Sequence, residues 1–152
     1  MSGLDNQTTR DFARLYPAHV AAFSRLLVSL RGVAGGDLDL ILLMAVIGDL
    51  QFARRSDPGT PTYEGLGRTP VRDGPTTNAY SLAAYTGIPR ETARRKVAAL
   101  VERGWVRADA RGNLVPTLEA ARALEEGTDA AVRFLEEIEA ARVAGETRSA
   151  KG

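Results

Sequence analysis

Two helical patterns separated by a three-residue turn constrain the fold of this chain more than any other feature. The first pattern spans residues 78–86 and begins at Asn78, a good N-cap, and the second spans residues 90–103. Gly87-Ile88-Pro89 lies between them, and Gly87 tolerates the positive φ that a sharp turn requires. The side chains that we expect to pack between the two helices are Leu82, Ala83, Ala84, Tyr85 and Ile88.

Two short extended segments follow the second helix, at residues 105–107 and 114–115, and a turn containing Gly112-Asn113 joins them. Trp105 begins the first segment and is expected to anchor it in the core. Helix, tight turn, helix and hairpin is the plan of a winged helix-turn-helix. The predicted fold class is therefore mostly α-helical with a small two-stranded β-wing, with further helices flanking this motif on both sides.

Before the motif, apolar residues recur at helical spacing over residues 9–31 and 38–54. Pro17 predicts either a kink or a new start within the first of these helices. Asp37 is the expected N-cap of the second, whose wide apolar face predicts burial at the centre of the core.

After the motif, Thr117 and Thr128 are the expected N-caps of two helices, over residues 118–126 and 128–144, separated at Gly127. We expect one domain over residues 1–152. Its parts are N-terminal helices (1–55), a Pro/Gly-rich loop (56–77), the helix-turn-helix and wing (78–117), C-terminal dimerisation helices (118–144) and a frayed polar tail (145–152). A loop as long as 56–77 is expected to be either functional or mobile.

Positive charge is concentrated in the motif although the formal net charge of the chain is only +1. Residues 78–116 carry 7 basic and 3 acidic side chains, whereas the segment before them is neutral and the segment after them is acidic. Of the 20 basic residues 18 are Arg, whose planar guanidinium suits phosphate and guanine recognition. A solvated helix face is the simpler alternative explanation of this basic cluster.

The composition excludes several classes of function. The chain has no Cys, which rules out disulfides and thiolate metal sites, and its one His, His19, is expected to be a packing or surface residue rather than a ligand. We therefore expect no enzyme, no catalytic residues, no metal and no cofactor. The longest apolar run, residues 40–48, is too short to span a bilayer, and the start of the chain does not resemble a signal peptide, so we expect a cytoplasmic protein.

The second helix of the motif has one apolar side and one polar side. The residues expected to point inward are Ala93, Val97, Leu100 and Val101. Those expected to point outward are Glu91, Arg95, Ala98 and Glu102, with Thr92 and Arg94 at the flanks. Because Glu91 and Arg95 are four residues apart, Glu91 is expected to orient the Arg95 guanidinium.

Residues 89–95, Pro-Arg-Glu-Thr-Ala-Arg-Arg, resemble the start of the recognition helix of the catabolite-activator (cyclic-AMP receptor) family, Ser-Arg-Glu-Thr-Val-x-Arg. The resemblance implies base contacts by Arg90, Glu91 and Arg95, and DNA-backbone contacts by Asn78, Tyr80 and Thr92. Two positions differ from the family pattern, because Pro89 replaces a hydroxyl residue and Lys96 stands where an apolar residue is usual. No cyclic-nucleotide domain precedes the motif, so nucleotide sensing is not implied.

The layout of the whole chain resembles the multiple-antibiotic-resistance regulator (MarR) family, in which helices on both sides of the motif build a homodimer. Asp109-Ala110-Arg111 is similar to the Asp-x-Arg wing of that family, and the resemblance implies that Arg111 enters a minor groove. The long loop at residues 56–77 differs from the family pattern.

Together these features predict a transcriptional regulator that binds double-stranded DNA sequence-specifically as a homodimer, with a recognition helix in the major groove. A small-molecule effector is left open, and no membrane partner is expected. The alternative is a winged-helix interaction module whose basic face meets an acidic protein. The expected DNA-binding residues are Asn78, Tyr80, Arg90, Glu91, Thr92, Arg94, Arg95 and Arg111.

Overall fold

The computed structural model describes residues 6–53 and 77–149, which fall into two compact units. One unit contains the N-terminal and C-terminal ends of the chain (1–32 and 126–152), and the other contains residues 33–125. Almost all of the loop predicted at residues 56–77 lies outside the described residues. None of the described helices is long and apolar enough to cross a membrane.

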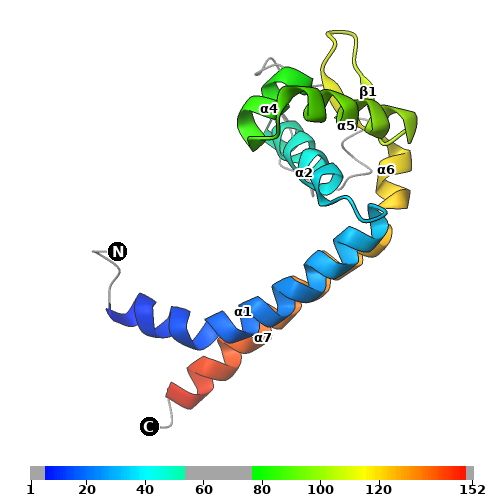
Figure 1. Cartoon of the computed structure of the whole chain (residues 1–152). Helices are drawn as coiled ribbons and strands as arrows, with labels where there is room; N and C mark the ends of the chain where they lie inside the picture. The colour runs from blue at the N-terminus through cyan, green and yellow to red at the C-terminus, as the bar shows by residue number, and fades with distance from the viewer. Residues whose placement is uncertain (1–5, 54–76, 150–152) are drawn as a thin grey trace. The chain divides into compact units, whose positions relative to one another are not determined.

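The central unit is built around helix α2 (Leu38–Ala53), which lies beside α4 (Ala79–Thr86) and α5 (Arg90–Glu102) (Figure 1) and also packs against strand β2 (Leu114–Pro116); helix α6 (Leu118–Ala123) belongs to the same unit. Helix α2 is apolar on more than one side, and a helix of this kind is stable only when it is surrounded. Its core residues include Leu43, Met44 and Ile47, none of which is more than 1% exposed. The expectation that this helix forms the centre of the core is confirmed.

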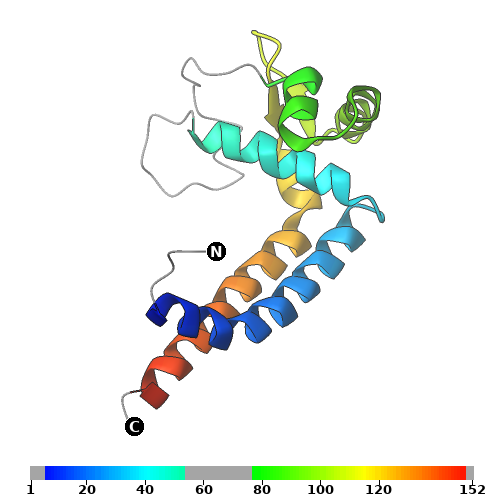
Figure 2. The same ribbon diagram turned by 60° about the vertical axis from the view of Figure 1, so that its left-hand side comes forward.

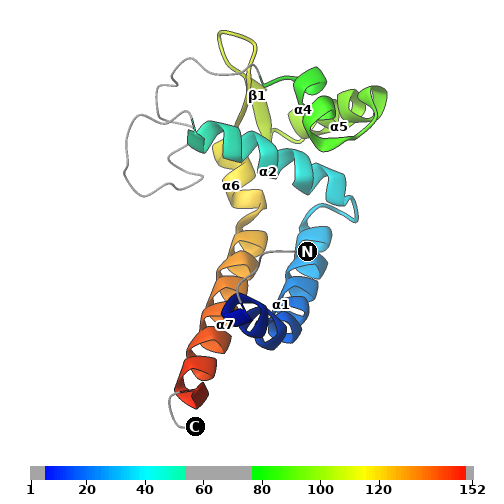
Figure 3. The same ribbon diagram turned by 90° about the vertical axis from the view of Figure 1, so that its left-hand side faces the viewer.

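Strands β1 (Val106–Ala108) and β2 (Leu114–Pro116) form an antiparallel hairpin that protrudes from the central unit (Figure 3). Thr77 extends the pairing, because its carbonyl oxygen accepts a hydrogen bond from the Leu114 N–H at 2.8 Å. Trp105 is 5% exposed at the base of the hairpin, where it anchors the wing in the core as expected. The mostly helical fold with a two-stranded wing is thus the predicted winged helix-turn-helix.

Lys96 has a structural role that the sequence alone did not reveal. Its Nζ lies 2.5 Å from Asp37 Oδ2 and 3.2 Å from Asp39 Oδ2, at the start of α2. A second oxygen of Asp37 accepts the Asp39 N–H, so Asp37 caps α2 as expected and binds α5 at the same time. The hydrogen bond that Lys96 donates to Asp37 lowers the pKa of Asp37 and raises the pKa of Lys96. An ion pair therefore occupies the position where an apolar residue is usual.

The other unit contains α1 (Asn6–Val33) and α7 (Glu125–Ser149), which run antiparallel and side by side (Figure 2). Phe134 of α7 meets Phe23 of α1 with ring centroids 6.2 Å apart, and Arg25 forms an ion pair with Glu137. Helix α1 continues through Pro17, and it bends in its N-terminal part (Figure 1), as a proline inside a helix causes.

Two expectations about the C-terminal helices are wrong. Helix α7 starts at Glu125 and runs without a break through Gly127 and Thr128, so Thr128 is inside a helix and caps nothing. Gly127 is buried within this helix. The segment expected to fray from Gly145 is helical to Ser149.

Candidate nucleic-acid interface

Local hydrogen bonds define both ends of α4, at the N-cap Asn78 that the sequence predicts and at Gly87 in the turn that leads to α5. Asn78 Oδ1 accepts the Ser81 N–H at 2.9 Å, and Ser81 Oγ accepts the Asn78 N–H at 3.0 Å, which completes a capping box. Gly87 ends α4 in the left-handed conformation, with φ 75°, and its N–H donates to the Ala83 carbonyl. Ile88 is buried directly after it. The left-handed Gly87 and the buried Ile88 thus define the turn from α4 into α5.

Helix α5 buries one side and exposes the other, as its pattern predicts. Ala93, Val97 and Leu100 are buried, and the exposed residues are Arg90, Glu91, Arg94, Arg95, Ala98, Val101 and Glu102. Three inward assignments are wrong, and the first is Ala84 of α4, which is exposed. Val101 is 48% exposed because it lies a further 100° around the helix from Leu100, and Tyr85 is 71% exposed on α4, whose buried residues are Leu82 and Ala83.

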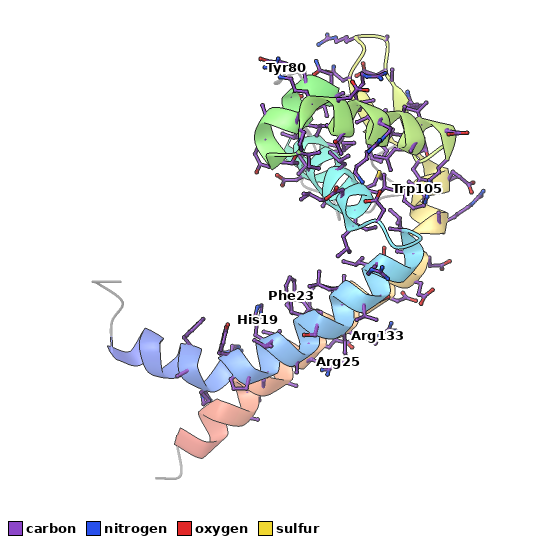
Figure 4. The ribbon with its side chains drawn as sticks, viewed as in Figure 1. His19, Phe23, Arg25, Tyr80, Trp105 and Arg133 are labelled. Carbon is purple, nitrogen blue, oxygen red and sulfur yellow. The ribbon has the colours of Figure 1, made fainter. Side chains whose placement is uncertain are left out.

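Arg90 and Tyr80 form a unit across the turn. Arg90 Nη2 donates to the Tyr80 hydroxyl at 3.2 Å, and the guanidinium carbon lies 4.4 Å from the centre of the Tyr80 ring. A guanidinium over an aromatic face is attracted by the ring quadrupole. Tyr80 is 61% exposed on the surface of the unit (Figure 4). The arrangement presents a cation and a phenol together to a ligand.

Glu91 pairs with Arg94 and not with Arg95, which corrects the expected pairing. Arg94 donates to both carboxylate oxygens of Glu91, with Nε at 3.0 Å and Nη2 at 2.6 Å. These hydrogen bonds, which Arg94 donates and Glu91 accepts, lower the pKa of Glu91 and raise the pKa of Arg94. Arg95 forms no hydrogen bond or ion pair with any residue that the structure describes, so its guanidinium is available to a ligand.

The wing carries two arginines. At its tip Asp109 Oδ1 accepts the N–H groups of Arg111 and Asn113, at 2.9 and 2.8 Å, and this holds the backbone of the turn around Arg111. Arg107 is exposed on β1 next to the buried Val106, and it was not among the expected DNA contacts. Strand alternation does not identify Arg107 from the sequence: Trp105 and Val106 are both buried, and counting in twos from Trp105 would place Arg107 inward.

The remaining expected contacts are only partly exposed. Thr92 lies at the side of α5, half-buried, and the side chain of Asn78 is engaged in the capping box through its oxygen, although its amide NH₂ is not part of that box. Among the residues described, no group of three or more His, Asp or Glu side chains has the arrangement of a metal site.

A short recognition helix with an arginine-rich exposed side, next to a basic β-hairpin, defines a winged helix-turn-helix protein of the kind that regulates transcription by binding DNA. A comparison with protein families supports this class, since residues 73–110, a quarter of the chain, match the model of the IclR helix-turn-helix domain. No curated protein and no solved structure matches the chain. Neither the catabolite-activator resemblance nor the MarR resemblance is confirmed by these comparisons.

Proposed function

We propose that the protein is a transcriptional regulator that reads a specific duplex sequence through Arg95 and Arg90 of α5. The observation that carries this proposal is the contrast between neighbouring cations on one helix. Arg94 and Lys96 are held by carboxylates, whereas Arg95 has no partner among the described residues and lies on the exposed side. A free guanidinium on the outer side of a recognition helix suits bidentate donation to a guanine edge in the major groove.

The other predicted contacts position the protein on the duplex. We propose contacts with the DNA backbone for Tyr80, for the NH₂ group of Asn78 and for the side chain of Thr92. Arg90, which is paired with Tyr80, contacts the backbone in addition to a base. Arg94 is proposed as a flanking contact that keeps its pair with Glu91, and Glu91 as an acceptor for a cytosine amino group. Arg111 is proposed to enter a flanking minor groove.

The test starts from duplexes selected from genomic fragments with the purified protein. Arg95→Ala is expected to cost about 1–3 kcal/mol of binding free energy on the selected site and to relax the preference at one base pair. The matched control is Arg122→Ala, because Arg122 is an exposed arginine that belongs to α6 and not to α5 or the wing. Equal losses for Arg95→Ala on selected and random duplex would contradict base reading and leave only a phosphate contact.

The interaction-module alternative gives a different result in the same experiment. A basic face built for an acidic protein would bind all duplexes with similar, salt-sensitive affinity, and no sequence would be enriched in the selection. The absence of any enriched fragment would therefore contradict sequence-specific reading before any variant is made.

We further propose that two copies associate through α1 and α7. Helix α7 exposes a stripe of apolar residues at helical spacing, with Val132 49%, Leu135 65% and Val143 47% exposed. Helix α1 exposes a second stripe, formed by Phe12, Tyr16, Val20 and Phe23, each at least 43% exposed. Contiguous apolar patches of this kind favour a protein interface, and a second copy of the same chain covers both stripes at once.

The oligomeric state tests this arrangement directly. Leu135→Glu with Val143→Glu is expected to halve the mass in light scattering, from twice to once the chain mass of 16.3 kDa. Ile138 is not used, because it is half-buried and lies one turn after Phe134, so its replacement would disturb the α1–α7 pair itself. Ala21→Glu, at an exposed position of α1 outside the stripe, is the control. A wild-type monomer at micromolar concentration would contradict the proposal.

A further inference from the structure

The exposed side of α5 changes character along its length. Its first half is charged and carries three arginines and Glu91. Its second half is apolar until Glu102, because Ala98 is exposed and Val101 is 48% exposed. The contacts proposed above all use the charged half of this side. The apolar half therefore has a role in recognition still to be assigned.

Ala98 lies near the centre of this exposed side. It comes four residues after Arg94 and three after Arg95, so it lies one turn further along and between them around the helix axis. Its side chain is a single methyl group, which reaches only what lies directly below the helix. Three residues advance a helix by about 4.5 Å, and base pairs follow one another at about 3.4 Å, so a base below Ala98 lies within about two base pairs of the one below Arg95.

The chemistry of Ala98 restricts what it can recognise. The side chain has neither a donor nor an acceptor, so a base group that needs a hydrogen bond would lose water beneath the helix without a replacement. Among the four bases, only thymine presents a methyl group in the major groove, and an alanine side chain can pack against it. An apolar position on the outer side of a recognition helix therefore favours thymine.

We infer that Ala98 is a specificity-determining residue that packs against the 5-methyl group of a thymine close to the guanine that Arg95 reads. The inference rests on the proposed reading of DNA and names a second base for the same site. The two contacts differ in kind, because Arg95 donates hydrogen bonds whereas Ala98 removes apolar surface from water. A residue that merely lets the helix approach the groove, without touching a base, would give no response to the thymine methyl group.

Deoxyuridine tests the contact, because it keeps the base pairing of thymidine and lacks only the 5-methyl group. Each T of the selected duplex is replaced singly, and fluorescence anisotropy compares the affinity of the full chain for the T and U duplexes. We expect about fourfold weaker binding for a T within about two base pairs of the guanine at which Arg95→Ala relaxes the preference, since one buried methyl group is lost. Equal binding of the T and U duplexes at every such position, or a selected site without T there, would overturn the inference.

Two glycine variants assign the contact to one side chain. Ala98→Gly removes the contacting methyl group from the protein, so its affinities for the T and U duplexes should agree within about 1.5-fold. Ala99→Gly is the matched control and should keep the fourfold difference, because Ala99 is half-buried and its replacement carries the same cost of a glycine within α5. Each ratio compares two duplexes bound to one protein, so partial unfolding of a variant cancels. A fourfold ratio that persists in Ala98→Gly would refute the assignment.

The inference and the proposed function fail in different ways. If no sequence is enriched in the selection, sequence-specific reading is contradicted, and the role of Ala98 with it. If a sequence is enriched and Arg95→Ala relaxes its preference, but uridine has no effect near that guanine, DNA reading stands and only the role of Ala98 is refuted.

Discussion

Replacing Lys96 with methionine removes the cation that joins α5 to the start of α2 while keeping a side chain of similar length. The Lys96 side chain is 15% exposed, whereas its partners Asp37 and Asp39 are 38% and 47% exposed. Exposed ion pairs contribute about 0.2–1 kcal/mol and breaking a fully buried pair costs about 3–5 kcal/mol. Since both carboxylates keep access to water, we expect Lys96→Met to lower the free energy of unfolding by about 1–2 kcal/mol, between these limits.

Urea denaturation of wild type and variant, followed by circular dichroism, measures this difference. Arg95→Met is the control, because Arg95 is the neighbouring residue, is exposed and has no partner among the described residues. It should change the unfolding free energy by less than about 0.5 kcal/mol. A double-mutant cycle of Lys96→Met with Asp37→Asn isolates the coupling between the two side chains from the effect of each substitution alone.

The pH dependence has a definite sign. Lys96 lowers the pKa of Asp37 in the folded state, so the stabilisation is fully present above the ordinary aspartate pKa of about 3.9 and is lost as pH falls through the lower folded value. The difference between wild type and Lys96→Met should therefore be constant from pH 5 to 8 and shrink below pH 4. The reasoning fails if Lys96→Met is no more destabilised than Arg95→Met, or if the difference persists unchanged at pH 2.5.

Two further substitutions test the turn and the wing. Gly87→Ala should destabilise the fold by about 1–2 kcal/mol, and Gly87→Asn by less. An added Cβ would meet nothing within 4 Å, so only the left-handed backbone opposes it, and equal denaturation midpoints for wild type and Gly87→Ala would contradict this. Arg111→Ala should weaken DNA binding most when the flanking minor groove is A·T-rich and narrow, measured by anisotropy on duplexes with exchanged flanks. A deficit that does not depend on flank composition would rule out the minor-groove role.

The parts of the fold that the sequence predicts correctly depend on interactions between residues close along the chain. Asn78 caps α4 because its side chain reaches the Ser81 N–H three residues later, and Gly87 takes a positive φ because nothing else in the turn tolerates it as well. The start of α5 at Arg90 follows from Pro89, which fits the entry to a helix. Such signals require no knowledge of the rest of the molecule.

The sequence predictions are wrong where the structure depends on a residue far away in the chain, or on a choice between two possible partners. Lys96 is held by Asp37, 59 residues earlier, and no local pattern identifies that partner. Glu91 had suitable arginines three and four residues away, and spacing alone does not distinguish them, because both lie on the same side of a helix. Thr128 has the chemistry of an N-cap, but α7 begins three residues before it, at Glu125, and continues past it.

The candidate site illustrates why a count of basic residues is an imperfect guide to a nucleic-acid surface. Residues 78–116 contain seven basic side chains, yet the structure commits several of them to intramolecular partners: Arg90 to Tyr80, Arg94 to Glu91, Lys96 to Asp37 and Arg103 to the Trp105 ring. These contacts have different consequences for DNA. Arg90 remains exposed, and its contact with the Tyr80 ring holds the guanidinium in place for a ligand. Lys96 is largely buried and joins α5 to the start of α2 instead. The concentration of charge therefore predicts a nucleic-acid surface, and we propose that the partners of each cation decide which one reads a base. On that criterion Arg95 is the principal candidate on α5.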